Sequence, residues 1–501
     1  MSGVRVTYSG LISFGISLIS VITGLIFVIL VTRKLSTEEF GLWTFIGSIV
    51  AQATIISPIV TYWVTRQVAR GEKIEKTALT TSGLLSLGGF VIYLILAFYV
   101  SNLHNIDFRI LLIGSTLIPL TFFLQTLNSI CLSLKPQAIS YGLIVFELVK
   151  IPLGIILVVT SDLGLIGALI ATIGATVANI LLLVFVIKDK IFGAIKTGII
   201  KFWIKMSWLS LYGILYELMW KFDVLIFSSF TTSLVGLAYW GVAGSITSMV
   251  VYSGKISDGL YSKLIATGKN EFAHDNFTRS LYFAIPILSA NIVLAKPLLH
   301  VLNPLYEEGI YVVIILSIRG FVHVIMGFYF SLIQGNENID LNKTASTKQF
   351  IKSNLFVIPT FMLLFSIIYV GSLFIFLAFF KTPQMSDYFL ISIWAMILLA
   401  TTIIFTIVGM LYVRKKLHFN FNYIPILKYA AVALLASIIV YLVSEKVLKY
   451  SERIFDFLPQ LIPILILGGG IYFGITYLID MSTKIFFKSF LNEFRRKRSI
   501  K

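Results

Sequence analysis

The chain is poor in cysteine and in charged residues. Its one cysteine among 501 residues is Cys131, so no intramolecular disulfide and no cysteine-based zinc or redox cluster can form. Only 13% of the residues are charged, whereas 58% are hydrophobic. A water-soluble protein of this length needs far more polar surface. The composition therefore excludes a soluble globular protein and favours a chain embedded in a membrane.

Sequence motifs of common enzyme classes are also missing. The chain has no Walker phosphate loop, no HExxH zinc motif, no GxSxG elbow and no paired-carboxylate pattern of a hydrolase. The loops between its apolar stretches are too short to hold a nucleotide-binding domain. We therefore expect a protein that is not an enzyme, with no cofactor and no bound metal.

What the chain does have is 14 apolar stretches, each long enough to cross a bilayer as a helix. Strands of a membrane barrel would be about ten residues long and would alternate in polarity. The sequence thus predicts an all-α polytopic membrane protein with about 14 transmembrane helices. The expected spans are residues 10–32, 40–64, 78–100, 109–133, 138–159, 163–187, 206–230, 234–257, 280–302, 308–334, 354–380, 386–412, 424–444 and 455–479.

Lysine and arginine are distributed unevenly along the chain. With the N-terminus placed in the cytoplasm, and with Lys255, Lys428 and Arg109 near span ends counted on the side they adjoin, 29 of the 40 fall on the inner side, seven on the outer side and four within spans. Cytoplasmic loops retain positive charge, and a missed span would exchange the sides of every later loop. We expect a multi-pass protein of the cell membrane with both termini cytoplasmic. The net charge of +17 then reflects topology, and we expect no nucleic-acid partner.

A basic segment, residues 188–205, divides the spans near the middle of the chain. It mixes five lysines with apolar residues, which suits an amphipathic linker lying on the anionic inner leaflet; a solvated loop is the alternative. Those apolar residues are Ile191, Phe192, Ile195, Ile199 and Trp203. The expected parts are an N-lobe (1–187), this linker (188–205), a C-lobe (206–412), two extra helices (413–480) and a basic cytoplasmic tail (481–501).

A weak internal repeat relates the two predicted lobes. Residues 36–42 (STEEFGL) and 231–237 (TTSLVGL) are 195 positions apart, and each segment precedes and opens an apolar span. Ser or Thr can cap the new helix, and the glycine permits close approach of two chains. Because six spans separate the copies, the repeats are parallel, an arrangement typical of transporters with the substrate site between the repeats.

Away from their ends, the predicted spans hold four cations. A cation near the centre of a bilayer costs roughly 2.5–3.5 kcal/mol, so such residues usually face a polar interior. They are Lys150, Lys221, Lys296 and Arg319. The planar guanidinium of Arg319 suits phosphate oxygens best, whereas Lys296 lies toward the outer end of its span and could reach the interface. We expect these cations to line a central cavity for an anionic substrate.

Acidic residues accompany two of these lysines. Glu147 precedes Lys150 by three residues and Glu217 precedes Lys221 by four, so helix geometry places each pair on one face. Each pair is either a local ion pair that lowers the cost of insertion or a cation presented to the substrate.

Two further titratable residues lie within the spans. Asp223 points away from the face of Lys221 and needs a partner on another helix. His323 follows Arg319 by one turn and could titrate near neutral pH. Coupling of transport to H⁺ or Na⁺ would use these residues together with Glu147 and Glu217.

Several short segments resemble those of a known transporter family. They are residues 33–43 (RKLSTEEFGLW), 221–226 (KFDVLI), 235–239 (VGLAY), Ala243, 303–306 (NPLY) and 334–335 (QG). In order and spacing they are similar to the polysaccharide and lipid-linked oligosaccharide flippases, including the O-antigen flippases of the Wzx type, whose superfamily also holds multidrug extruders. The resemblance implies two six-helix lobes around a central cavity plus two C-terminal helices, alternating access, and a lipid-linked sugar as substrate.

The sequence therefore favours a flippase that moves a prenyl-diphosphate-linked oligosaccharide or polysaccharide precursor across the cell membrane. Its expected partners are this substrate, membrane lipids and polysaccharide assembly proteins. One alternative is an extruder of drugs or metabolites on the same fold. Another is a membrane scaffold of envelope assembly that transports nothing.

Overall fold

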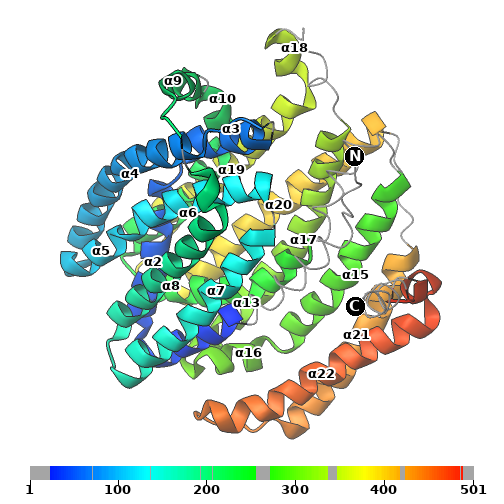
Figure 1. Cartoon of the computed structure of the whole chain (residues 1–501). Coiled ribbons are helices and arrows are strands. Elements are labelled where there is room, and N and C mark those ends of the chain that lie inside the picture. The colour runs from blue at the N-terminus through cyan, green and yellow to red at the C-terminus, as the bar shows by residue number, and fades with distance from the viewer. Residues whose placement is uncertain are drawn as a thin grey trace, which may run out of the picture. The chain divides into compact units, whose positions relative to one another are not determined.

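The structure of the protein, a computed structural model, describes residues 23–69, 71–135, 137–191, 193–205, 207–254, 271–336, 347–417, 424–485 and 487–488. Throughout these residues the regular structure is helical, and none of them forms a strand (Figure 1). Helices satisfy their own backbone hydrogen bonds, as a chain surrounded by lipid requires. The predicted all-α fold is confirmed.

The helices match most of the predicted spans. Ten helices in the described part of the chain are long and apolar enough to cross a membrane, or up to twelve if two sharply bent pairs each count as one span. These twelve coincide with predicted spans. The first predicted span begins outside the described residues and continues as the helix of residues 23–34. The seventh is divided into three short helices, α10 (Ser207–Tyr212), α11 (Leu215–Trp220) and α12 (Phe222–Thr231).

The chain forms two compact units, and each is described by itself. Unit one is Met1–Ser245 with Thr344–Thr401, and unit two is Ile246–Lys343 with Thr402–Lys501. This division follows internal packing and differs from the predicted lobe boundaries, which stay a prediction. Of the predicted basic tail (481–501), the described residues include 481–485 and 487–488, and the rest lies outside them.

Unit one contains most of the helices. Besides α10 to α12, its described helices are α2 (Thr37–Ala53), α3 (Pro58–Ala69), α4 (Glu75–His104), α5 (Phe108–Ser115), α6 (Leu117–Leu134), α7 (Gln137–Gly154), the π-helical η1 (Ile155–Thr160), α8 (Gly164–Ile187), η2 (Lys188–Lys190), α9 (Thr197–Lys205), α18 (Thr347–Lys352) and α19 (Asn354–Phe379). The first parts of α13 (Leu234–Tyr252) and α20 (Asp387–Leu417) also belong to it.

Unit two is built around α15 and α17. Its described helices are α15 (Glu271–Val293), α16 (Ala295–Leu302), η4 (Pro304–Gly309), α17 (Ile310–Gly335), α21 (Ile424–Val447) and α22 (Ile454–Ile479), with the later parts of α13 and α20. The two C-terminal helices pack on α15 through tyrosines. Tyr472 donates a 2.8 Å hydrogen bond to the carbonyl oxygen of Tyr282, whose own hydroxyl lies 3.0 Å from that of Thr476.

Local sequence explains where individual helices begin. At the first repeat segment, the Ser36 hydroxyl accepts a 3.1 Å hydrogen bond from the Glu39 amide, and the Glu39 carboxylate accepts a 2.9 Å bond from the Ser36 amide. This reciprocal capping satisfies two amides that the first turn of α2 leaves without helical partners. Between η1 and α8 the chain turns through Asp162 and Gly164, both with a φ of 52°, a conformation that glycine adopts easily and aspartate tolerates.

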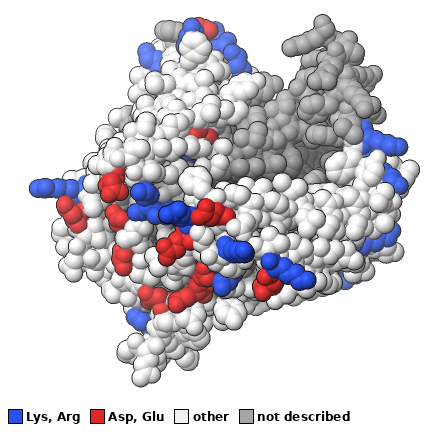
Figure 2. All heavy atoms as spheres, turned by 90° about the horizontal axis from the view of Figure 1, so that it is seen from below, with Lys and Arg blue, Asp and Glu red and all other residues white. Residues whose placement is uncertain are grey.

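The long helix α4 shows how the protein meets its surroundings. A stripe of large apolar side chains spaced three or four residues apart is exposed along it: Leu84, Leu87, Val91, Ile95 and Phe98. The opposite face buries small residues and Tyr93. Large exposed apolar patches are rare on soluble proteins, so this stripe faces lipid. On the face shown in Figure 2, most of the described surface is likewise uncharged, and charged side chains gather in limited areas.

The orientation of the chain in the membrane is open to a direct test. With Cys131 replaced by serine, a single cysteine at Lys73, exposed between α3 and α4, should resist a membrane-impermeant maleimide in intact cells. A cysteine at Glu452, exposed between α21 and α22, should react. The physical reason is that cytoplasmic loops of membrane proteins retain lysine and arginine. Permeabilised cells should label at both positions. Labelling of the Lys73 position in intact cells would contradict the topology.

Candidate functional site

The Glu147 and Lys150 side chains form a buried ion pair on α7. The Lys150 Nζ lies 2.9 Å from the Glu147 Oε2, and the two side chains are only 10% and 9% exposed. The ammonium also lies 5.1 Å and 4.6 Å from the ring centres of Phe27 and Phe146, within the range of cation–π attraction. These contacts offset the insertion cost that made Lys150 a candidate, and they leave little of its ammonium exposed.

The predicted pairing of Glu217 with Lys221 is not formed. Among the ion pairs of the described residues none joins these two side chains, and the Glu217 Oε1 instead accepts a 3.1 Å hydrogen bond from Tyr216. The backbone keeps its helical spacing between them, because the Lys221 amide donates a 3.1 Å hydrogen bond to the Glu217 carbonyl oxygen, and the helix breaks only at Lys221, between α11 and α12. At this bend the Lys221 carbonyl oxygen accepts a 2.6 Å hydrogen bond from the side-chain amide of Gln52 on α2.

Asp223 has the partner on another helix that its position required. Its Oδ2 accepts a 2.8 Å hydrogen bond from the hydroxyl of Tyr369 on α19, and its Oδ1 accepts a 2.7 Å bond from the amide of Val224. The Tyr369 hydroxyl in turn accepts a 2.6 Å bond from the indole N–H of Trp394 on α20. Asp223 is 4% exposed, and a buried carboxylate is tolerated only with such partners. The chain of bonds joins α12, α19 and α20.

Aromatic rings surround this chain of hydrogen bonds. The Trp394 ring stacks on Trp240 at 3.8 Å between centroids and on Phe227 at 4.8 Å. On the other side Trp220 packs edge-on against Tyr369 at 5.9 Å. Such contacts add to the burial energy and fix the ring positions. Asp223 therefore lies in a rigid, apolar surrounding within unit one.

The remaining candidates belong to unit two. Arg319 and His323 lie one turn apart on α17, where Ser317 contacts Asn291 of α15 through a 3.1 Å hydrogen bond. Lys296 lies 3.5 Å from Glu307 Oε2 and 4.7 Å from the ring centre of Tyr450, with its side chain half exposed. These local contacts account for Lys296 without a substrate. Convergence of the cations of unit one with Arg319 on one cavity remains a prediction.

The two copies of the internal repeat meet inside unit one. A methyl group added to Gly41 on α2 would overlap the carbonyl oxygen of Leu234 at the start of α13. A methyl group on Gly241 of α13 would overlap the hydroxyl of Thr44 on α2. Only glycine allows two helices to approach so closely. We call this contact between α2 and α13 the repeat seam.

Polar contacts extend the repeat seam to neighbouring helices. The Tyr99 hydroxyl on α4 lies 2.9 Å from the Ser229 hydroxyl on α12. The His104 Nε2, at the last residue of α4, lies 2.6 Å from the Ser228 hydroxyl. Together with the bond from Gln52 to Lys221, these contacts join α2 and α4 of the predicted N-lobe to α12 of the predicted C-lobe.

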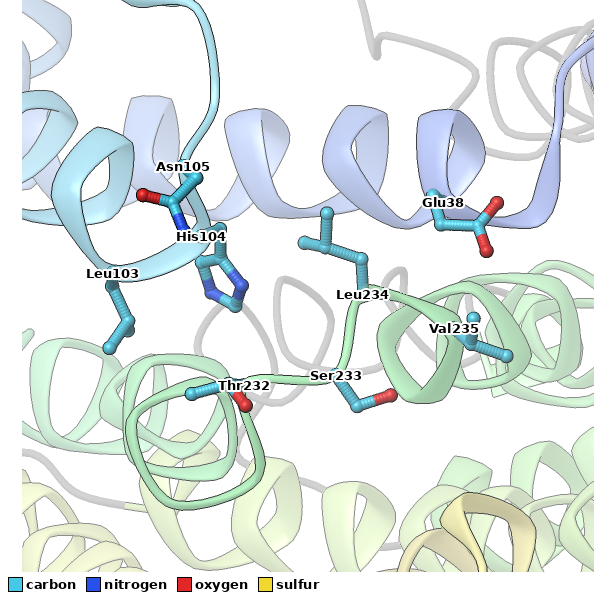
Figure 3. Close-up of a pocket in the computed structure, with 8 residues that line it drawn as sticks. All are labelled: Glu38, Leu103, His104, Asn105, Thr232, Ser233, Leu234 and Val235. Carbon is cyan, nitrogen blue, oxygen red and sulfur yellow. The ribbon is translucent and has the colours of Figure 1, made fainter.

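A pocket of about 370 Å³ lies beside the repeat seam (Figure 3). Figure 3 shows that its lining comes from the end of α4, from the start of α2 and from the connection between α12 and α13. The lining combines apolar side chains with four kinds of polar group: a carboxylate, an imidazole, an amide and hydroxyls. The lining residues are Glu38, Leu103, His104, Asn105, Thr232, Ser233, Leu234 and Val235.

None of the sequence-predicted site residues lines this pocket. The signal that could have found it is the repeat, because Glu38 belongs to one copy and Thr232 to Val235 belong to the other. His104 and Asn105 carry no pattern that marks them in the sequence. Among the described residues, no group of three or more His, Cys, Asp or Glu is placed to hold a metal ion.

Comparison with solved structures identifies the fold. A lipid II flippase, MurJ, in an inward closed conformation matches with a TM-score of 0.61 over 93% of this chain and 98% of MurJ, at 17% identity. An inward-facing multidrug resistance transporter of the MATE family in the MOP superfamily matches with a TM-score of 0.56 over 81% of this chain and 98% of its own, at 15% identity. The chain has the fold of the MOP transporters.

Sequence comparison adds nothing finer to this MOP fold. No family model matches the chain, and no curated protein matches it. A further MATE structure, in a straight conformation, matches with a TM-score of 0.55 over 82% of this chain and 95% of its own at 15% identity. Because the MOP fold occurs both in a drug extruder and in a lipid flippase, the fold alone does not define a substrate.

Proposed function

We propose that the protein is a flippase that carries a prenyl-diphosphate-linked oligosaccharide or polysaccharide precursor from the inner to the outer face of the cell membrane. The observation that supports this most is the extent of the structural matches. The MATE match leaves about a fifth of this chain without a counterpart, whereas the match to the lipid II flippase leaves less than a tenth. Both neighbours are themselves covered almost completely, so the flippase is the better match in length.

Transport of this substrate requires a polar path for its head group. A sugar and a diphosphate must pass about 30 Å of hydrocarbon, while the prenyl tail can stay in the bilayer. In our proposal, Arg319 binds the diphosphate with its planar fork of donors, and Lys221 and Lys150 add positive charge. The head group enters from the inner side while the repeat seam keeps the outer side closed. Parting of α2 from α13 then opens the outer side.

In this scheme, titratable residues within the helices couple transport to an ion. Asp223 is the best placed, because its carboxylate binds Tyr369 and, through it, Trp394, on two helices that follow it in the chain. Binding of H⁺ or Na⁺ at Asp223 would exchange one set of these bonds for another. Glu217, Glu147 and His323 are the further candidates.

Specific observations favour each of the two alternatives. MATE structures match with TM-scores of 0.56 and 0.55, which keeps a drug or metabolite extruder as second candidate. The buried ion pair of Glu147 and Lys150 has no net charge, and a scaffold without transport would also contain such a pair. Polysaccharide assembly proteins are the expected partners in the flippase and scaffold cases.

Replacement of Arg319 tests the proposed function. In vesicles reconstituted with a lipid-linked sugar, Arg319→Lys should lower the transport rate about tenfold or more, since one bidentate, charge-assisted contact contributes roughly 1.5–3 kcal/mol. Arg319→Gln should lose more. The control is Arg279→Gln, which removes an exposed ion pair with Asp275 and should transport normally.

Two outcomes would count against the proposal. Normal transport by Arg319→Lys would show that the planar fork is not required. Normal transport by Arg319→Gln as well would remove the main support for an anionic substrate. Protein levels in the vesicles are measured in each case, so that a failure of insertion is recognised.

A further inference from the structure

The linker of residues 188–205 is fixed to unit one by specific contacts. The Trp203 side chain is fully buried, and its indole N–H donates a 2.9 Å hydrogen bond to Gln67 Oε1 on α3. The Lys196 amide donates a 3.0 Å bond to the Thr77 hydroxyl in the first turn of α4. The linker is therefore a docked element of the protein rather than a free loop.

The linker contacts unit one through apolar residues for which the sequence predicted contact with lipid. Trp203 belongs to a buried core cluster with residues of α3, α6 and α8, among them Val64 and Leu183. Ile191 and Ile199 pack against the same cluster. Three of the five apolar residues of the predicted lipid-facing side are thus turned toward the protein; Phe192 lies outside the described residues.

The side of the linker that faces away from the core cluster carries both exposed apolar side chains and exposed lysines. Ile195 and Ile204 are 44% and 61% exposed, whereas Phe202, 39% exposed, packs edge-on against Trp63 of α3 with 5.0 Å between ring centroids. All five lysines are exposed as well, and none of them forms an ion pair with an acidic side chain of the described residues. These lysines are Lys188, Lys190, Lys196, Lys201 and Lys205.

The contact of Lys196 with Thr77 gives the depth of this surface. Leu84 is the first large apolar side chain exposed on α4, so the hydrocarbon begins near it. Thr77 precedes Leu84 by seven residues, which is about 10 Å along a helix. The polar layer on each side of a bilayer is roughly 5–8 Å thick. The Lys196 amide therefore lies at or just beyond the outer edge of the head-group layer, and the long side chains of the linker lysines reach back into that layer.

We propose that the exposed side of residues 188–191 and 193–205 is a binding surface for anionic phospholipids of the inner leaflet. The lysines contact the phosphates, and Ile195 and Ile204 pack against the head-group layer between them. Each lysine near an anionic membrane surface contributes about 1 kcal/mol. The apolar side chains between the lysines fit a lipid, which offers both phosphate and hydrocarbon, better than a nucleic acid. This surface does not depend on which substrate the protein transports.

A fluorescent reporter on the full chain tests the surface. In a Cys131→Ser background, Ile204→Cys carries an environment-sensitive label, and the protein in neutral detergent is titrated with short-chain phosphatidylglycerol or phosphatidylcholine. No prenyl lipid is present, so transport substrate plays no part. We expect a blue shift at far lower concentrations of phosphatidylglycerol. Lys196→Gln/Lys201→Gln/Lys205→Gln should raise its half-saturation on the order of a hundredfold, from three contributions of about 1 kcal/mol.

A matched variant controls for loss of charge. Lys352→Gln/Lys415→Gln/Lys416→Gln removes three exposed lysines elsewhere and should leave the titration unchanged. Equal responses to the two lipids would overturn the proposal, and so would an unchanged titration of the linker variant. An equal loss in the control variant would also overturn it, because binding would then follow overall charge. The thermal unfolding midpoint of each variant shows whether the protein remains folded.

Discussion

Glu147→Ala should lower the free energy of unfolding by about 3–5 kcal/mol, because it leaves the buried Lys150 ammonium without its carboxylate. Changing both residues, as Glu147→Gln/Lys150→Met, should restore most of the loss, since a buried ion pair is often replaced by apolar groups at little cost. The measurement is the unfolding of the purified full chain in one fixed detergent. Asp275→Ala removes an exposed pair and should cost about 0–1 kcal/mol.

The double variant also separates the two interpretations of Lys150. If the pair only lowers the cost of burying charge, Glu147→Gln/Lys150→Met should transport at the wild-type rate. If Lys150 contacts an anionic head group, the stable double variant should be defective in transport. A double variant as unstable as Glu147→Ala would contradict the ion-pair account itself.

The second large effect is expected at the repeat seam. Gly41→Ala places a methyl group on the carbonyl oxygen of Leu234, so α2 and α13 must move apart. Overpacking of this kind costs about 1–3 kcal/mol, and we expect a strong loss of transport because the seam no longer closes. Both are measured on the same preparation, as the unfolding midpoint and as the rate of vesicle transport.

The control for Gly41 lies on the same helix. A methyl group on Gly47 meets no atom within 4 Å, so Gly47→Ala should leave transport intact and should stabilise α2 slightly, as alanine does in a helix interior. Equal behaviour of the two variants would show that the close approach at Gly41 has no functional role.

Features that depend on local sequence were predictable. The apolar windows gave the positions of twelve spans, and the reciprocal capping by Ser36 and Glu39 follows from their spacing of three residues. The repeat pointed to residues 36–42 and 231–237, which form the seam. In each case the signal is contained in a few consecutive residues, because helix length and capping are local properties.

Features that depend on distant partners were not predictable. The break at Lys221 involves Gln52, which lies 169 residues away, and the partner of Asp223 is 146 residues away. Periodicity marks an apolar side of the linker, but it cannot tell whether lipid or protein covers that side. Trp203 faces the protein because it packs into a buried cluster formed with residues of α3, α6 and α8. The position of this cluster depends on the packing of the whole unit.

The length of α4 makes the protein sensitive to membrane thickness. Its 30 residues span about 45 Å, half as much again as the hydrocarbon of a typical bilayer. Thr77 near one end holds the basic linker, and His104 at the other end lines the pocket. A thinner bilayer tilts such a rod or leaves more of it outside. Hydrophobic mismatch therefore acts on the linker and the pocket together, through one rigid helix.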